Sequence, residues 1–394
     1  MISKKMQETV QNSSMIRAMF EDGKKMKELY GAENVYDFSL GNPNTPPPQE
    51  INRIIFDILQ NEKPTLVHGY MNNAGYEDVR GAIAKSINKK FNTSFGVQNI
   101  LMTTGAAGGL NVILKTLLDP EDEVIVFAPY FSEYRVYAEN YGGKLVVVPP
   151  DTADFQPNLE KFKEKITSRT KAVIVNSPNN PTGVVYSEDT VRKLAEILRQ
   201  ARKEFHTDIY LIADEPYREL VYDGVFVPYI PRYYENTIVA YSYSKSLSLP
   251  GERIGYLVIP DEVADFEAVI SGAGTANRIM GFVNAPSLMQ RTVAKCLDME
   301  ADTDGYNKNR EALYQGLIEA GYECVKPQGA FYLFVKSPIE SDKEFCQLAK
   351  QHRLILVPGS AFACPGYVRI AYCVSYDTIM AALPKFKELM LEVS

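Results

Sequence analysis

The order of apolar and polar positions divides the chain into expected helices and strands. Residues 15–30 have the spacing of an amphipathic helix, and a short apolar segment that suits a strand follows at Val35–Leu40. The next segment, GNPNTPPP at 41–48, breaks the pattern, because successive prolines cannot continue a helix or join a central strand. We therefore expect an N-terminal piece over residues 1–46.

From about residue 100, short apolar runs alternate with helical patterns. Runs bounded by Gly, Pro, Asn or Asp suit strands that are buried on both faces. One intervening helix is marked by an apolar stripe from Leu110 to Leu118. The alternation predicts an α/β domain with a largely parallel sheet over residues 47–288. The predicted strands are Ile100–Thr103, Val124–Ala128, Leu145–Val148, Ala172–Asn176, Ile209–Ala213, Thr237–Tyr241 and Gly255–Ile259.

The pattern changes from about residue 290. Two helical stretches flank a hairpin-like segment, GAFYLFVK at 329–336, and a later strand at Tyr367–Cys373. This arrangement predicts a smaller α+β domain over residues 289–394.

Composition narrows the class of protein. The 394 residues are 45% hydrophobic and 23% charged, with a net charge of −7. No run of Lys or Arg is long enough to follow a phosphate backbone, which argues against nucleic acid as the main partner. Apolar runs are far shorter than the ~20 residues that span a bilayer, and the N-terminus has no signal-peptide pattern. Five cysteines without a C-x-x-C pair and three histidines support neither a disulfide framework nor a metal site. We expect a cytoplasmic protein without a membrane partner.

Several polar segments follow predicted strands, where open α/β sheets bind their ligands. Thr103–Gly109 joins a strand to a helix, and its small residues Gly105, Ala106 and Ala107 would let backbone amides approach an anion, although a tight packing turn explains them equally well. In VNSPNNPTG (175–183), Asn180 could project a fixed amide; alternatively the segment is a structural turn.

One acidic and one aromatic candidate come next along the chain. Asp214 stands at the end of an apolar strand, where a charge is costly without a partner. Such carboxylates usually cap a following helix, which is the alternative here. Tyr217 lies three residues on and would point the same way from a helical turn.

The most specific segment is TIVAYSYSKSLSLPGERIGY at 237–256. It carries Ser242 and Lys245 out of a strand, and Arg253 follows the lysine. A lone lysine is nearly always a solvated surface charge, but this one is flanked by hydroxyl residues. Arg369 lies on a later apolar strand, where a guanidinium needs a carboxylate, either from an internal Asp or Glu or from a ligand.

Together these residue types match pyridoxal phosphate. A lysine amine forms a Schiff base with its aldehyde, and an aspartate keeps its pyridine nitrogen protonated. Helix N-terminal amides with an arginine and a serine would bind its phosphate.

The chain resembles the class I and II aminotransferases, which are fold type I pyridoxal phosphate enzymes and include aspartate aminotransferase. The resemblance runs from about Met15 to Thr378 and rests on SPNNPTG, ADEPY, SYSKSLSLPGERIGY and YVRIAY, in the family's order and spacing. It implies a large cofactor-binding domain and a smaller domain formed by both termini. It also implies transfer of an amino group between an L-amino acid, such as aspartate or an aromatic one, and a 2-oxo acid such as 2-oxoglutarate.

The resemblance also implies a role for each site residue. Lys245 would form the Schiff base and move protons, Asp214 would bond the pyridine nitrogen, and Asn180 and Tyr217 would hold the ring's phenolic oxygen. Ser242, Arg253 and the backbone of Gly105, Ala106 and Ala107 would bind the phosphate. Phe131, with Tyr130 as the alternative, would stack on the ring, because the chain has no Trp. Arg369 would bind the substrate α-carboxylate beside Gly41, and Tyr70 would reach the phosphate of a neighbouring subunit in a homodimer with shared active sites.

Three other functions share some of these sequence features. Ser242 to Lys245 also fits S-x-x-K, but the S-D-N and K-T-G partners of that acylating chemistry are missing from the sequence. A C–S β-lyase of the cystathionine type would use the same lysine and is not separated by these motifs. A non-enzymatic regulator would need an appended DNA-binding segment, and none is visible. Arg278 could bind a second substrate carboxylate, or it could be a surface residue.

Overall fold

A sheet of seven strands forms the centre of the computed structural model, which describes residues 2–11 and 15–393. The strand order is β2-β8-β7-β6-β5-β3-β4, and only β8 runs antiparallel to its two neighbours. The predicted, largely parallel sheet is therefore confirmed, and every predicted strand of this region is present. The strands are β2 (Ile100–Thr103), β3 (Glu123–Phe127), β4 (Lys144–Val148), β5 (Thr170–Asn176), β6 (Tyr210–Asp214), β7 (Thr237–Ser242) and β8 (Gly255–Val258).

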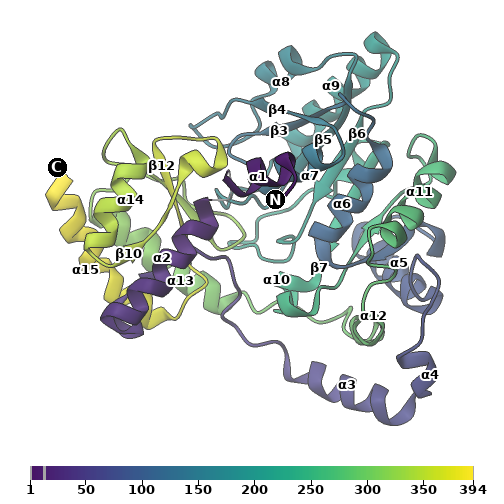
Figure 1. The fold of residues 1–394 in the computed structure, drawn as a ribbon, viewed down its shortest axis with the longest axis horizontal. Helices are drawn as coiled ribbons and strands as arrows, with labels where there is room; N and C mark the ends of the chain where they lie inside the picture. The colour runs from purple at the N-terminus through teal and green to yellow at the C-terminus, as the bar shows by residue number, and fades with distance from the viewer. Residues whose placement is uncertain (1, 12–14, 394) are drawn as a thin grey trace.

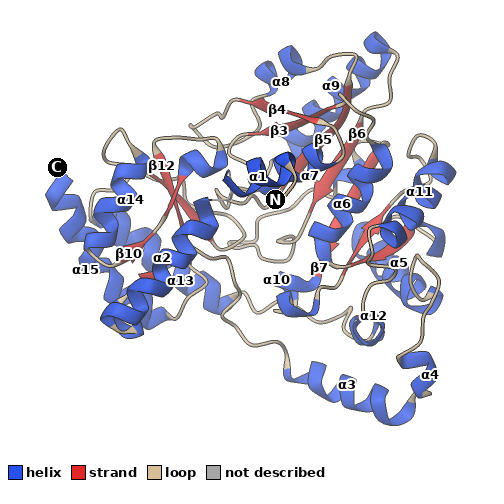
Figure 2. Ribbon diagram, viewed as in Figure 1, coloured by secondary structure: helices blue, strands red, loops and turns tan. Residues whose placement is uncertain are grey.

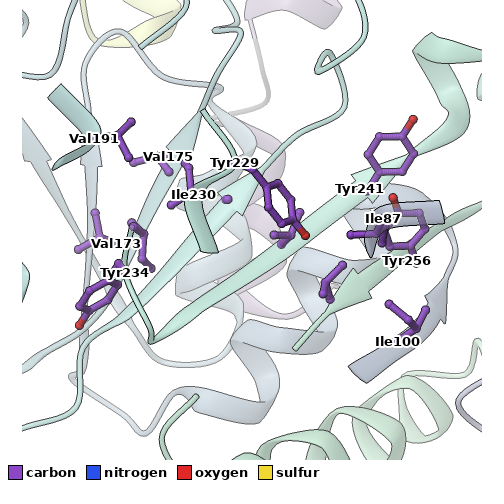
Figure 3. Packing of buried hydrophobic residues seen from close by; sticks show 14 of the residues in the cluster. Ile87, Ile100, Val173, Val175, Val191, Tyr229, Ile230, Tyr234, Tyr241 and Tyr256 are labelled. Atoms are coloured by element: carbon purple, nitrogen blue, oxygen red, sulfur yellow. The ribbon is translucent and has the colours of Figure 1, made fainter. Parts of the chain in front are cut away.

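Helices cover both faces of this sheet (Figure 2). One face packs against α5 (Glu77–Phe91), α8 (Leu159–Lys165), α9 (Glu188–Phe205) and α12 (Ser287–Ala294), and the other against α6 (Gly105–Leu117), α7 (Glu133–Asn140) and α11 (Phe266–Ile279). Successive strand residues point to opposite faces, so Val173 and Val175 join the first core and Ala172 and Ile174 the second. Figure 3 shows part of the first core, where Val175 lies near Val191 of α9.

A third core is built around a small antiparallel sheet in the order β11-β12-β9. Its elements are β9 (Tyr332–Lys336), β10 (Leu354–Ile355), β11 (Val357–Pro358), β12 (Tyr367–Ala371), α13 (Asp304–Glu319), α14 (Asp342–Gln351) and α15 (Tyr376–Val393). The strand expected within 329–336 is present, but the hairpin is wrong, because β9 pairs with the distant β12. The residues before β9 bond elsewhere: Gly329 N–H donates to Gly183 O and Ala330 N–H to Leu220 O.

The N-terminal segment packs against this C-terminal core. α1 (Lys4–Gln11) and α2 (Met15–Tyr30) precede β1 (Tyr36–Asp37), which pairs in parallel with β10, and Figure 1 shows α2 among the C-terminal elements. The strand predicted over Val35–Leu40 is thus only two residues long. Beyond it, the carbonyls of Ser39 and Leu40 accept hydrogen bonds from the side chains of Arg369 and Cys373 instead of from a neighbouring strand.

The remaining helices are α3 (Gln49–Asn61), α4 (Pro64–Val67) and the short α10 (Tyr243–Ser246). α12 contacts α3 and α5, so the expected domain boundary after residue 288 falls inside a helix that packs with the large sheet. Both expected boundaries remain predictions. Among the described residues, no helix combines the length and the apolar character needed to cross a bilayer.

Candidate active site

One cavity of about 300 Å³ lies where the carboxyl ends of β5, β6 and β7 meet β9 and β12 of the small sheet. Parallel strands that end at one sheet edge bring residues distant in sequence together there. The cavity is lined by every predicted site residue except Gly105 and Tyr70, namely by Gly41, Ala106, Ala107, Phe131, Asn180, Asp214, Tyr217, Ser242, Lys245, Arg253 and Arg369.

Lys245 reaches the cavity from α10, directly after β7. The Ser242 hydroxyl caps this helix by accepting a hydrogen bond from Ser244 N–H at 3.2 Å. The Lys245 ammonium donates to Gly41 O at 2.7 Å, and Nζ lies 5.2 Å from the centroid of the Phe331 ring. Burial lowers the pKa of Lys245 to about 8, because the charged amine loses its hydration. This lysine therefore lines the cavity and is not a solvated surface charge.

Asp214 ends β6 and is almost completely buried. Its Oδ2 accepts a hydrogen bond from the Tyr134 hydroxyl at 2.5 Å, whereas Oδ1 has no partner among the described residues. Burial raises the pKa of Asp214 to about 7, and the Tyr134 hydrogen bond opposes that rise. A cationic N–H group placed against Oδ1 would satisfy the free oxygen and stabilise the carboxylate.

Gly105, Ser242 and Arg253 surround the N-terminus of α6. A Cβ on Gly105, whose φ is +74°, would lie 2.9 Å from an Arg253 amino group and 3.5 Å from the Ser242 hydroxyl. The Arg253 guanidinium donates only to backbone carbonyls, Pro250 O at 2.9 Å and Thr104 O at 3.4 Å, and has no carboxylate partner in the described chain. Amides at a helix N-terminus beside a free guanidinium form a site suited to a phosphate.

Arg369 extends from β12 into the opposite side of the cavity and is 2% exposed. Its guanidinium donates to Asn180 Oδ1 at 3.0 Å and to Ser39 O at 2.6 Å, while Nε is without a partner among the described residues. No described carboxylate forms an ion pair with it, so pairing with an internal Asp or Glu is excluded for this part of the chain. Burial lowers the pKa of Arg369, as expected for a cation that awaits an anionic ligand.

Two predicted residues do not line the cavity, and Phe131 differs from its alternative, Tyr130. Tyr70 is 93% exposed and does not line this cavity. Gly105 borders the cavity through its neighbours Arg253 and Ser242. Phe131 lines the cavity and Tyr130 does not, which favours Phe131 as the ring-stacking residue.

Three site residues were not anticipated from the sequence. Tyr134 bonds Asp214, the Asn176 amide donates to Asp214 O at 2.9 Å, and the hydroxyls of Tyr332 and Tyr217 lie 2.9 Å apart. Asn176 could have been found, because it ends its strand at the same level as Asp214, its partner across β5 and β6. The other two offered no signal beyond belonging to tyrosine-containing segments.

Comparison with known proteins identifies the family. The model of the class I and II aminotransferases matches residues 33–386, and the chain belongs to this family. Aspartate aminotransferase of Thermotoga maritima is 31% identical over 95% of this chain and 96% of its own length. A crystal structure of an aminotransferase from Eubacterium rectale superposes with a TM-score of 0.97 at 44% identity over the whole of both chains. An aspartate aminotransferase of Thermus thermophilus, solved with maleate, gives a TM-score of 0.86 at 26% identity over 97% of this chain and 98% of that chain.

The protein is therefore a pyridoxal phosphate-dependent aminotransferase, which exchanges an amino group between an amino acid and a 2-oxo acid. The cavity fits this cofactor on its own geometry. The unpartnered Oδ1 of Asp214 suits a protonated pyridine nitrogen, and the site around Gly105, Ser242 and Arg253 suits a phosphate. The buried amine of Lys245 stands in the same cavity and suits the aldehyde.

Proposed function

We propose that this cavity is the active site of the aminotransferase and that Lys245 holds the cofactor covalently and moves the substrate proton. One observation carries the proposal. The buried Lys245 amine, the unpartnered oxygen of Asp214 and the unneutralised guanidinium of Arg369 all face a single cavity. Each of these groups is costly when buried alone, and one cofactor together with one amino acid substrate would satisfy all three.

The residues around the cofactor have separate tasks. When bound, pyridoxal phosphate supplies the electron sink for the charge that develops as the α-proton leaves. The Asp214 carboxylate would accept a hydrogen bond from the pyridine nitrogen and balance its charge. Asn180 and Tyr217 would donate to the phenolic oxygen, and Phe131 would pack on the ring. Ser242, Arg253 and the amides of Gly105, Ala106 and Ala107 would hold the phosphate.

Lys245 is suited to proton transfer once substrate is bound. With a pKa of about 8, its amine is available as a base near neutral pH, at a far lower cost than an ordinary lysine. Nζ takes the proton from the α-carbon of the amino acid, and the apolar rings of Phe331 and Tyr217 beside it exclude water that would compete.

Arg369 binds the α-carboxylate of the substrate. The Asn180 and Ser39 contacts fix its guanidinium plane, so that Nε and the remaining N–H groups face the ligand. Gly41 lies beside it and leaves room for the substrate, because any side chain at this position would collide with Tyr332.

We propose aspartate or an aromatic amino acid as the donor and 2-oxoglutarate as an acceptor, supported by relatives named aspartate, aspartate/prephenate and aromatic-amino-acid aminotransferase. Among the lining residues described, the only cations are Lys245, Arg253 and Arg369, and each already has a partner in this scheme. Binding of a second substrate carboxylate therefore requires a cation that is not among these lining residues. The exposed Arg278 at the end of α11 is the candidate.

The active enzyme is proposed to be a cytoplasmic homodimer with shared sites. The Tyr70 side chain is 93% exposed, and the apolar side chains of Phe56 and Leu66, nearby in the chain, are 67% and 53% exposed. Covering these apolar side chains with a second copy would remove them from water and would bring Tyr70 to the partner's phosphate site.

The decisive test is Lys245→Ala in the purified enzyme. We expect loss of the cofactor's visible absorbance band and of half-transamination, because no other lysine among the described residues lines the cavity. Lys89→Ala, at an exposed lysine, is the matched control and should behave as wild type. A Lys245→Ala protein that still forms a borohydride-reducible adduct at another lysine would disprove the assignment.

A panel of amino donors against 2-oxoglutarate would define the substrate. Incubation with cystathionine alone distinguishes a β-lyase from an aminotransferase, since a β-lyase releases ammonia and pyruvate without any 2-oxo acid acceptor. We expect no such release, and transfer that depends strictly on the 2-oxo acid.

A further inference from the structure

Tyr332 lines the cavity, but the proposed function gives it no part in binding or catalysis. It begins β9, is 2% exposed and lines the same wall as Arg369. Arg369 pairs with Phe334 across β9 and β12, so Tyr332, two residues before Phe334, lies on the same face of the sheet. The Arg369 guanidinium accordingly packs 4.6 Å from the centroid of the Tyr332 ring.

The Tyr332 hydroxyl meets the Tyr217 hydroxyl at 2.9 Å. The two rings are edge to face, with centroids 5.8 Å apart and planes at 80°. Neither hydroxyl has another hydrogen-bond partner within the described part of the chain. Each hydroxyl has a single proton, so one proton lies between the two oxygens and the other is available for a ligand.

Local charge decides which tyrosine donates. The titratable groups that act on Tyr332 are Arg369 on β12, Cys373 after it and Tyr217. Burial raises the pKa of Tyr332 to about 12, and the Arg369 guanidinium is the largest influence opposing that rise. For Tyr217, burial and then Tyr332 raise the pKa, and Arg369 lowers it by less than Tyr332 raises it. The Tyr332 hydroxyl, beside the Arg369 guanidinium, is therefore the better hydrogen-bond donor.

The backbone of Gly41 closes the space on another side of Tyr332. A Cβ at residue 41 would lie 1.8 Å from the Tyr332 hydroxyl oxygen, so the Gly41 backbone approaches it closely. The Tyr332 hydroxyl therefore lies between the Gly41 backbone and the Tyr217 hydroxyl.

We propose that Tyr332 is a positioning residue, which donates to the Tyr217 hydroxyl and so directs the Tyr217 proton towards the ring oxygen of the bound cofactor. The inference rests on the proposed role of Tyr217. A hydroxyl that accepts a hydrogen bond becomes a stronger donor, so Tyr332 strengthens the bond that Tyr217 makes. Tyr332 also packs on Arg369. It therefore connects the residue proposed to bind the substrate carboxylate with Tyr217, the residue proposed to donate to the ring oxygen of the cofactor.

The test is a pH titration of the cofactor's visible absorbance in the substrate-free holoenzyme. In Tyr332→Phe, Tyr217 becomes a weaker donor, and more negative charge stays on the ring oxygen. That charge holds the proton on the adjacent Lys245 nitrogen more tightly, so the midpoint should rise by about 0.3–1 pH unit. Replacing Tyr332 by 3-fluorotyrosine, whose hydroxyl is a stronger donor, should lower the midpoint and gives a second test should the phenylalanine variant not fold.

Two further variants separate the possible outcomes. Tyr222→Phe removes a hydroxyl from the same core, one that donates to Ala330 O and does not line the cavity, so the midpoint should not move. Tyr217→Phe should raise the midpoint more than Tyr332→Phe does. An unchanged or lowered midpoint in Tyr332→Phe, with Tyr217→Phe raised, overturns the role of Tyr332 alone. An unchanged midpoint in Tyr217→Phe overturns the proposed role of Tyr217 as well.

Discussion

The Tyr134 hydroxyl donates to Oδ2 of Asp214 at 2.5 Å and leaves Oδ1 without a partner among the described residues. One carboxylate oxygen is thus fixed and the other is kept for a ligand. The Asn176 amide adds a bond to the backbone carbonyl of Asp214, so both the side chain and the main chain of this residue are held in place. An acidic group oriented before the cofactor arrives loses little freedom on binding.

Removal of the Tyr134 hydroxyl should weaken cofactor binding. In Tyr134→Phe, the pKa of Asp214 loses an influence that lowers it, so more of the carboxyl is neutral and unable to balance the pyridine nitrogen. We expect the Kd for pyridoxal phosphate to rise about tenfold, as for one hydrogen bond to a charged group. Titration of the apoenzyme by absorbance measures this. Tyr130→Phe, at a neighbouring tyrosine outside the cavity, is the control; equal Kd values for both variants would contradict the role of Tyr134.

The pKa of Lys245 predicts how cofactor capture depends on pH. Only the neutral amine attacks an aldehyde, and burial lowers the pKa to about 8, so the reactive fraction grows as pH rises towards that value. The rate of absorbance change on mixing apoenzyme with pyridoxal phosphate should rise about tenfold per pH unit below pH 8 and level off above it. Stopped-flow traces across the pH range test this. A rate that keeps rising to pH 10 would indicate an ordinary, solvated lysine.

Arg369→Lys should impair the use of amino acids. The lysine cannot reproduce the planar pair of N–H groups and would lose contacts with Asn180 or Ser39. We expect kcat/KM for an amino acid donor to fall about 10- to 100-fold, equivalent to one or more charged hydrogen bonds. A primary amine without the carboxylate is the control substrate, and its slow reaction should not change. If both substrates lose rate equally, Arg369 acts on the fold and not on the carboxylate.

Shared active sites can be tested by mixing two inactive variants. Lys245→Ala leaves Tyr70 intact, and Tyr70→Ala leaves Lys245 intact. In a hybrid dimer, one site would combine the intact Lys245 of one subunit with the intact Tyr70 of the other. Activity should therefore reappear after the two proteins are unfolded and refolded together, but not when each is refolded alone. No recovery in hybrids verified by their mass would show that Tyr70 does not serve the partner's site.

Arg278→Ala separates the two readings of this arginine. If Arg278 binds a second carboxylate, kcat/KM should fall at least tenfold for aspartate and stay constant for an aromatic donor. The exposed Arg232 offers a matched substitution, Arg232→Ala, that should affect neither substrate. Unchanged values for both donors would place Arg278 among ordinary surface residues.

The strands of the large sheet could be predicted because their signal is local. Runs such as Ile209–Ala213 are apolar throughout, since both faces of the sheet are covered by helices. The antiparallel direction of β8 and the order of the strands were not predictable, because they depend on how connections cross the sheet. The expected strand at Val35–Leu40 was too long because its length depends on a partner strand that the local pattern does not reveal. Its partner β10 lies more than 300 residues away and offers only two paired residues.

That Lys245, Asp214 and Arg369 line one cavity could be predicted, because each is of a residue type suited to one chemical task. The site was not predictable where a residue acts through another. Tyr134 and Tyr332 are ordinary aromatic residues in sequence, and each makes its hydroxyl contact with a residue 80 or 115 positions away. Such contacts depend on the register of strands and helices, which the pattern of apolar positions does not determine.

The bond between Ser39 O and Arg369 joins positions 330 residues apart. During synthesis the ribosome would complete the whole seven-stranded sheet before the arginine emerges, while the early segment waits without its partner strand β10. A chain halted before residue 354 would therefore already contain Gly105, Ser242, Arg253 and Lys245 but not Arg369. The residues proposed to hold the cofactor are thus synthesised before the residue proposed to bind the substrate carboxylate.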